Sequence, residues 1–343
     1  MRIHLGHFLD SGSPYVRVEA PAKLNLFLEV LGKRDDGFHQ IETLMCPISL
    51  CDHLLVELVD ENDDITLELE LPEAAVFRKV SDGDSDPAWK IPSGEENLVV
   101  RAARRLRELS GCRDGIRIRL DKQIPASAGM AGGSSDVAAA LVACSHLWGC
   151  WDRELITQIC AELGSDIAFF LGDENQIGLG LAQGRGEVCD QLAIRPNLRF
   201  LVLHPPEGCP TGEIYREYKS QGEPREFRKI VSACETGQVR KIGAELFNAL
   251  QFPASRYTSW IDRQLDFLRS NGFEFVLMSG SGSSCFGMFL SKEALSPGSE
   301  EVEAFSQGAN ELGIDRVYDV EAWYAPSIER QLVPNQNASN DSA

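Results

Sequence analysis

The sequence IPASAGMAGGSSD, residues 124–136, decides the fold of this chain. The alternating pattern GIRIRLD at 115–121 predicts a strand before it, and the alanine-rich pattern SSDVAAALVACSHLW at 134–148 predicts a helix after it. When a strand, a glycine-rich turn and a helix follow one another, the backbone N–H groups of the turn lie at the positive end of the helix dipole. Because glycine has no side chain, an anion can approach those N–H groups closely. The segment therefore predicts a phosphate-binding loop.

This loop lacks the lysine of the phosphate-loop pattern GxxxxGK[ST]. Backbone amides, the hydroxyl groups of Ser134 and Ser135 and a divalent metal ion would have to hold the phosphates instead. Either serine could be the metal ligand. A structural tight turn explains a glycine-rich segment equally well, so the loop alone leaves both interpretations open.

Strand and helix patterns alternate along the rest of the chain. Partly alternating apolar residues predict paired strands at 16–30, interrupted at Pro21, and Asn97 is a suitable N-cap for a helix that ends at Gly111. Further elements are predicted as strands at 54–59, 65–71, 200–204, 275–278, 285–290 and 316–322, and as helices at 152–163, 227–247, 258–270 and 299–312. Short connections between these elements favour an α+β fold over a doubly wound sheet.

A chain of 343 residues exceeds the roughly 250 to 300 residues at which a single core stops growing, which predicts two lobes. We place them at 14–192 and 197–325, with the boundary in the polar stretch between them. The segment 73–94 is polar and lacks clear periodicity, which indicates a surface insertion without chemistry. Residues 331–343 are predicted to form a disordered tail.

The composition argues against several classes of function. A formal net charge of −19 opposes binding to nucleic acid or to an anionic membrane, because clustered Lys and Arg hold those partners. The ten cysteines are scattered without CxxC or zinc spacing, which is typical of buried thiols in a reducing compartment. His4, His7 and Asp10 interrupt the N-terminal segment, unlike a signal peptide, and no apolar run approaches the roughly 20 residues of a membrane span. We therefore predict a cytoplasmic protein, whereas the sequence does not predict its oligomeric state.

Six segments of the chain form an ordered series of motifs. They are PAKLNLFLEVLGKRDDGFHQIETL at 21–44, PASAGMAGGSS at 125–135, GSDIAFFL at 164–171, GRGE at 184–187, HPPEGCPTGEIY at 204–215 and MSGSGSSCFGMF at 278–289. In this order they resemble the motifs of the GHMP kinase superfamily and, more narrowly, of its members that phosphorylate 4-diphosphocytidyl-2-C-methyl-D-erythritol. The resemblance covers about residues 16–325, and six ordered motifs are far more specific than one.

The resemblance implies a two-lobed α+β fold, with a ribosomal-protein S5 domain 2-like lobe at the N-terminus and a ferredoxin-like lobe at the C-terminus. The substrates would lie in the cleft between the lobes. The implied reaction transfers the γ-phosphoryl group of ATP, with Mg²⁺, to the 2-hydroxyl of 4-diphosphocytidyl-2-C-methyl-D-erythritol, a step of non-mevalonate isoprenoid biosynthesis. Phosphoryl transfer asks chiefly for positioning and for neutralisation of charge.

The family's catalytic residues match Lys23 and Asp166 of this chain. The resemblance places the lysine, together with Asn25, beside the reacting hydroxyl, and the aspartate accepts or orients the hydroxyl proton. Taken alone, Lys23 would be a solvated side chain on an edge strand, and Asp166 would be an N-cap after Gly164 and Ser165. The motifs that contain the two residues favour the catalytic roles.

The resemblance also assigns binding residues. Phe38 and His39 match an aromatic-histidine pair in which the ring stacks on cytosine and the imidazole bonds to the edge of the base, and Tyr215 matches an aromatic residue on the other side of the base. A buried aromatic ring beside a loop histidine is the alternative. The remaining substrate contacts are Thr211 and a glycine loop formed by Gly280, Ser281 and Gly282. This loop also supports the phosphate loop, and a tight turn explains its glycines as well. The nucleotide contacts are Asn97, Lys122, Pro125, Ala126, Ser127, Ala128, Gly129, Met130, Ala131, Gly132, Gly133, Ser134 and Ser135.

The chain departs from the family pattern at four places. Phe38 stands where Tyr is usual, Ala131 where Gly is usual, Ala168 where Pro is usual, and Asn248-Ala249 where Asn-Asp is common. Ala131 fits a phosphate cradle only with a negative φ, because a positive φ is costly for a residue with a side chain. None of the departures removes a catalytic group.

Three other functions stay open. Another GHMP kinase, acting on an isoprenoid alcohol, homoserine or a sugar, would share the phosphate loop without the cytosine site, and Phe38, His39 and Tyr215 favour the cytidine substrate. A non-catalytic sensor could use the same fold, since fold does not fix function, but the presence of Lys23 and Asp166 argues against it. A nucleic-acid-binding role on an S5-like domain is opposed by the net charge.

Overall fold

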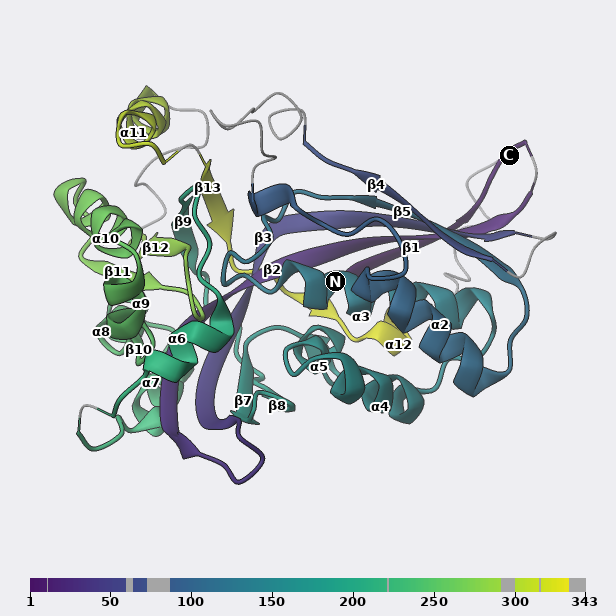
Figure 1. Cartoon of the computed structure of the whole chain (residues 1–343), viewed down its shortest axis with the longest axis horizontal. Coiled ribbons are helices and arrows are strands. Elements are labelled where there is room, and N and C mark those ends of the chain that lie inside the picture. Colours follow the sequence, from purple (N-terminus) through teal and green to yellow (C-terminus); the bar gives the residue numbers. More distant parts are fainter. Residues whose placement is uncertain are drawn as a thin grey trace.

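The computed structural model describes the following residues of the chain: 1–10, 12–59, 64–72, 87–220, 222–290, 300–314 and 316–332. In this part of the chain the strands form two main sheets, against which helices pack, as Figure 1 shows. This combination confirms the predicted α+β fold class. Residues 73–86 of the predicted insertion and 333–343 of the predicted tail lie outside the described residues.

The first sheet contains the longest strands. β2 (Pro14–Lys33) and β3 (His39–Val59) pair antiparallel and run together across the molecule in Figure 1. The sheet has the order β1 (Arg2–His7), β2, β3, β5 (Gly115–Asp121), β4 (Ile65–Glu70). Shorter strands extend it: β7 (Gly180–Gly184) pairs with β3 and with β8 (Val188–Gln191), and β10 (Phe247–Asn248) pairs in parallel with β2.

The prediction of two strands separated at Pro21 is wrong. β2 is one continuous strand, and a β-bulge between Pro21 and Ala22 accommodates the proline, which cannot donate a ladder hydrogen bond. The predicted strand 54–59 is likewise only the C-terminal end of β3. A proline marks a break in the sequence pattern, whereas a bulge becomes visible only when the partner strand is known.

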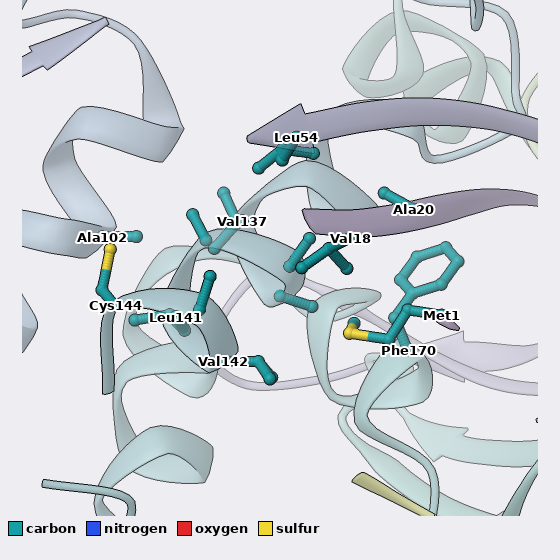
Figure 2. Packing of buried hydrophobic residues seen from close by; sticks show 14 of the residues in the cluster. Met1, Val18, Ala20, Leu54, Ala102, Val137, Leu141, Val142, Cys144 and Phe170 are labelled. Carbon is teal, nitrogen blue, oxygen red and sulfur yellow. The ribbon is translucent and has the colours of Figure 1, made fainter. Parts of the chain in front are cut away.

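Helices α2 (Leu98–Ser110), α3 (Gly132–Leu147), α4 (Arg153–Leu163) and α5 (Ile167–Leu171) pack on one side of this sheet (Figure 1). α3 is buried along most of its length, because it is apolar on nearly all sides. In Figure 2, Val137 of α3 points toward Leu54 of β3, and Cys144 lies beside Ala102 of α2. The loop before α3 therefore sits on a helix that is held firmly from several sides.

The second sheet is antiparallel and lies at the other end of the molecule. Its order is β11 (Phe275–Met278), β12 (Cys285–Met288), β9 (Arg199–His204), β13 (Arg316–Glu321). The helices of this part are α6 (Thr211–Glu217), α7 (Phe227–Glu235), α8 (Val239–Ala244), α9 (Gln251–Tyr257), α10 (Trp260–Ser270) and α11 (Glu300–Glu311). The predicted single helix at 227–247 is wrong, because the chain turns at Gly237, whose φ is 64°, and enters β10 at Phe247.

The end of the described chain returns to the first sheet. β14 (Ala325–Pro326) pairs with β6 (Gln176–Ile177), and α12 (Ile328–Leu332) packs beside β1. The side chain of Gln331 accepts a hydrogen bond of 2.9 Å from the N–H of Ile3. The predicted tail therefore begins too early, since Gln331 and Leu332 are helical and their partners lie near the other end of the sequence. No helix of the described residues is both long enough and apolar enough to cross a membrane.

Candidate active site

A cavity of about 1190 Å³ gathers residues from β2, the loop before α3, the starts of α2, α5 and α6, the turn between β7 and β8, and the loop at 280–282. Of the predicted site residues, all line this cavity except Met130 and Ser135, which are fully buried. Of the two candidate metal ligands, Ser134 therefore faces the cavity. Lys90, Ile91 and Pro92 line it too, so the end of the predicted insertion is part of the site and not a segment without a role.

The predicted phosphate loop leads directly into α3. Ala131 is the residue before the helix, and its carbonyl accepts the N–H of Ser135 at 3.0 Å. Ala131 has a φ of 54° and a ψ of 33°, so the negative φ that was expected of an alanine in a phosphate cradle is not found. The left-handed conformation costs an alanine about 1 to 2 kcal/mol, which the packing of the loop and of α3 must offset. Gly133 is open, since a Cβ built there meets nothing within 4 Å.

A second glycine loop, residues 279–284, holds the phosphate loop in place. The hydroxyl of Ser279 donates to the carbonyl of Gly129 at 3.0 Å, and the N–H of Ser284 donates to the carbonyl of Ala128 at 3.2 Å. Gly129 has a φ of 73°, and a Cβ built there would lie 2.2 Å from the carbonyl oxygen of Ser279. The two loops therefore touch through their backbones, which only glycine permits at this point.

Asn248 braces the second glycine loop, a role that sequence reasoning missed. Its buried amide nitrogen donates to the carbonyls of Met278 and Gly280, both at 2.8 Å, and its Oδ1 accepts the N–H of Leu250 at 2.9 Å. The sequence showed only an Asn-Ala pair, and nothing in the spacing pointed to this contact.

Lys23 and Asp166 meet inside the cavity. The Lys23 ammonium nitrogen lies 3.7 Å from Oδ2 of Asp166, donates to Oδ1 of Asn25 at 2.6 Å and donates to the carbonyl of Gly129 at 3.0 Å. Burial lowers the pKa of Lys23, and the nearby carboxylate of Asp166 opposes this shift. Lys23 is only 3% exposed, so the interpretation as a solvated lysine does not hold.

Asn25 is fixed from behind by Thr43, another residue that sequence reasoning missed. The amide nitrogen of Asn25 donates to the Thr43 hydroxyl at 2.8 Å, and that hydroxyl donates to the carbonyl of Phe27 at 2.6 Å. This chain of donors leaves Oδ1 of Asn25 as the acceptor that faces Lys23. The position of the ammonium group is therefore set by the sheet.

Asp166 occupies the position before α5 without acting as its cap. Its backbone is helical, with a φ of −79° and a ψ of −7°, and its side chain makes no capping hydrogen bond. The side chain is 34% exposed and lines the cavity. The alternative interpretation of Asp166 as an N-cap is therefore wrong, and the carboxylate is free to act on a ligand.

The predicted base-binding residues lie together at another part of the cavity. The rings of His39 and Tyr215 have centroids 5.1 Å apart at an angle of 31°, and Tyr218 meets His39 edge-on at 6.3 Å. Burial and the charge of Lys33 lower the pKa of His39, which keeps the imidazole neutral near pH 7. Phe38 is 54% exposed, and the guanidinium carbon of Arg185 lies 5.0 Å from its ring centroid.

The side chains of two predicted nucleotide contacts form hydrogen bonds within the protein. The Asn97 side chain accepts from the N–H of Val99 at 2.8 Å as the cap of α2, and it donates to the carbonyl of Pro92 at 2.7 Å. Lys122 is buried, and its ammonium group donates to Asp52 and, at 2.7 Å, to Asp136. Burial lowers the pKa of Lys122, but the two carboxylates outweigh this effect and raise it. Both residues line the cavity while their side chains hold the protein together.

Comparison with known proteins identifies the family. Residues 97–173 match the family described as GHMP kinases N terminal domain, and residues 230–307 match the one described as GHMP kinases C terminal. A 4-diphosphocytidyl-2-C-methyl-D-erythritol kinase from Rhodopirellula baltica is 32% identical over 86% of this chain and 93% of its own length. The enzyme of that name from Pelotomaculum thermopropionicum is 36% identical over 80% of this chain and 89% of its own.

Solved structures share the fold. A crystal structure of 4-(cytidine 5'-diphospho)-2C-methyl-D-erythritol kinase superposes with a TM-score of 0.66 at 31% identity, covering 90% of this chain and 99% of that one. Homoserine kinase from Cytophaga hutchinsonii superposes with a TM-score of 0.63 at 16% identity, covering 94% of this chain and 98% of that one. The latter identity shows a common fold and no more. On the strength of the relatives that match along most of its length, this chain belongs to the GHMP kinase family.

Proposed function

We propose that this chain is an ATP-dependent kinase that phosphorylates the 2-hydroxyl of 4-diphosphocytidyl-2-C-methyl-D-erythritol. The cavity is the observation that carries the proposal, because one space is lined by an open phosphate loop, by Lys23 and Asp166, and by His39 with its aromatic neighbours. Lys23 reaches the phosphate loop through its bond to Gly129, and Asp166 raises the pKa of Tyr215 in addition to the effect of burial. Lys23 thus contacts the phosphate loop, and the charge of Asp166 acts on the base-binding region.

The relatives support the identity of the acceptor. Those that are 32% and 36% identical carry the name of this one kinase, and so does the structure that is 31% identical. The base-binding region supports the same choice, since a neutral histidine can both donate to and accept from the edge of a cytosine, and aromatic rings can stack on its faces.

In the proposed mechanism the oxygen of the 2-hydroxyl forms a bond to the γ-phosphorus of ATP while Asp166 accepts the hydroxyl proton. The bond from that phosphorus to the bridging oxygen of ADP breaks at the same time. Before the transfer, Lys23 stabilises the ionised carboxylate of Asp166. During the transfer, it stabilises the negative charge on the reacting groups beside it. Asn25 and Thr43 hold the ammonium group in position, so that no reorganisation is needed during the reaction. The N–H groups at the start of α3 bind the phosphates.

Mg²⁺ belongs to the proposal, and when bound it would neutralise charge on the phosphates of ATP. Within the described residues, no group of three or more His, Cys, Asp or Glu side chains could hold a metal. Mg²⁺ commonly keeps few protein ligands and binds through phosphates and one or two side-chain oxygens. Ser134 lines the cavity, and so does Asp136, whose buried Oδ1 has no hydrogen-bond partner in the described part of the chain. These oxygens fit the role.

A direct assay tests the function. The purified protein is incubated with ATP, Mg²⁺ and the diphosphocytidyl-methylerythritol, and the product is identified by mass spectrometry. We expect the substrate to gain one phosphoryl group in step with the formation of ADP, while homoserine and mevalonate stay unchanged in parallel reactions. Phosphorylation of homoserine or mevalonate in place of the cytidine compound would contradict the proposal, as would ADP formation without any phosphorylated acceptor.

A further inference from the structure

Arg185 has a place in the cavity that neither catalysis nor base binding explains. It lies in the turn between β7 and β8, lines the cavity and extends over the ring of Phe38, with 5.0 Å from its guanidinium carbon to the ring centroid. The next residue, Gly186, borders the catalytic pair, since a Cβ built there would lie 3.5 Å from Oδ1 of Asp166. The turn therefore connects the base-binding region with the place of phosphoryl transfer.

The partners of Arg185 leave part of its guanidinium group unused. Its Nε lies 3.6 Å from Oε1 of Glu187, and its backbone N–H donates to Oε2 of the same carboxylate. Within the described residues, the two terminal amino groups of Arg185 have no hydrogen-bond acceptor. The side chain is 32% exposed and the residue lines the cavity, so these groups are accessible to a ligand bound there. Glu187 and Phe38 together fix the direction of the side chain.

The chemistry of the proposed substrate supplies a partner for these groups. A diphosphate joins its cytidine to its methylerythritol, so a molecule with its base at His39 and its hydroxyl at Asp166 must place the diphosphate between them. Arg185 borders both regions. An arginine binds phosphate oxygens through two parallel N–H bonds and remains charged at any ordinary pH. The chain carries a net charge of −19, so a substrate with two phosphate groups needs basic residues close to it, and Arg185 is one of those that line the cavity.

We propose that Arg185 binds the diphosphate of the cytidine substrate and so selects cytidine diphosphate compounds over uncharged cytidine ligands. This assignment rests on the proposed function. Lys23 is less suited to this task, because Asn25 and the carbonyl of Gly129 already occupy two of its donors and Asp166 neutralises its charge. The stacking of Arg185 on Phe38 holds the guanidinium group ready before the substrate arrives, which reduces the entropy lost on binding.

Calorimetry with two simple ligands tests the assignment. Binding of CDP and of cytidine is measured while a saturating, non-hydrolysable ATP analogue blocks the phosphate loop. We expect the parent protein to prefer CDP to cytidine, and Arg185→Gln to lose roughly tenfold to 100-fold of its CDP affinity, as for a lost charge-assisted bond. Its affinity for cytidine should change by less than about twofold, which also shows that the variant is folded. Arg185→Lys keeps the charge but not the planar fork, so its affinity for CDP should lie between that of the parent protein and that of Arg185→Gln.

Arg240→Gln is the matched control, because it removes the same charge from an exposed pair with Glu274 away from the cavity. It should keep the preference of the parent protein. If Arg185→Gln keeps that preference as well, Arg185 does not bind the diphosphate, and the proposed function stands without it. If the parent protein binds neither CDP nor cytidine, the proposed function itself is wrong, and the role of Arg185 falls with it.

Discussion

The ammonium group of Lys23 lies 3.7 Å from the carboxylate of Asp166, although one residue belongs to the strand β2 and the other precedes the helix α5. The pair is completed by Asn25 and by the carbonyl of Gly129, which hold the ammonium group at hydrogen-bond distance. Asp166 is close enough to stabilise the buried cation and keeps its oxygens available to a ligand. This arrangement suits a carboxylate that takes a proton and returns to its charged state after each turnover.

The base-binding region predicts that His39→Ala weakens the binding of the cytidine substrate more than the binding of ATP. Removing one partner of a buried hydrogen bond costs about 1 to 3 kcal/mol, so KM for the cytidine compound should rise by roughly fivefold to 100-fold. KM for ATP should stay within about twofold of the parent value. Steady-state kinetics with each substrate varied in turn provide the measurement, and His53→Ala, an exposed histidine on the same strand, is the control. Equal losses for both substrates would mean that His39 has a structural role.

The phosphate loop predicts different outcomes for two of its glycines. A side chain at Gly133 meets no protein atom within 4 Å and would occupy the cavity, so Gly133→Val should lower ATP affinity by about tenfold or more in a folded protein. A methyl group at Gly129 would lie 2.2 Å from the carbonyl oxygen of Ser279, so Gly129→Ala should destabilise the protein itself. Calorimetry of ATP binding and thermal unfolding separate the two effects. Unchanged ATP affinity in Gly133→Val would place the nucleotide elsewhere.

The left-handed conformation of Ala131 predicts a stabilising substitution. Ala131→Gly removes a strain of about 1 to 2 kcal/mol and adds some flexibility to the unfolded chain, so the free energy of unfolding should rise by about 0.5 to 1 kcal/mol. The same change at Ala138, a buried position within α3, should instead lower it by about 1 kcal/mol or more. Urea titration measures both variants. A loss of stability in Ala131→Gly would show that the alanine methyl group contributes more by packing than the strain costs.

The buried His204 predicts a dependence of stability on pH. Burial and the charge of Arg316 lower its pKa to about 3, and its Nδ1 lies 3.0 Å from the Ser284 hydroxyl. The unfolded chain takes up a proton near pH 6.5 that the folded protein refuses, so stability is full above that pH and falls as the pH drops toward 3. Between pH 7 and pH 5.5 this histidine should remove about 1 kcal/mol from the free energy of unfolding.

Urea titrations of the parent protein and of His204→Asn across this interval check the pH effect of His204. The variant loses some stability at every pH, so the informative quantity is the slope of stability against pH, which should be smaller in the variant. An identical slope in both proteins would show that His204 takes up its proton in the folded state.

Much of the site could be predicted from the sequence because its residues occur in short motifs. Phosphate-loop glycines, the Phe38-His39 pair and Asp166 are recognisable from neighbours within a few positions, and the structure brings them to one cavity. The roles of Asn248 and Thr43 could not be predicted because their partners are distant in sequence, at Gly280 and Asn25. A single buried amide or hydroxyl has no local signature.

The wrong expectations have the same origin. Pro21 broke the strand pattern, yet the bulge that accommodates it depends on β3. Ala131 broke the rule for positive φ, because the contacts around the loop offset a local cost. The side chain of Lys122 pairs with Asp52 and Asp136, which needs β3 and α3 to meet and had no local signal, while its contact with the nucleotide stays a prediction. Each case is a tertiary contact that outweighs a local preference. The division into lobes at 14–192 and 197–325 stays a prediction.

Single-turnover phosphorylation by Asp166→Asn tests the central claim most directly. Asparagine keeps nearly the same shape but cannot accept the hydroxyl proton, so both substrates should still bind, while the rate of the chemical step should fall by roughly 10² to 10⁴. Asp152→Asn, which removes a charge from the cap of α4, should leave the rate unchanged. A fall of less than about tenfold would reduce Asp166 to orienting the hydroxyl, since the loose transition state of phosphoryl transfer needs little help from a base. A rate equal to that of the parent protein would contradict the assignment of Asp166 and the mechanism built on it.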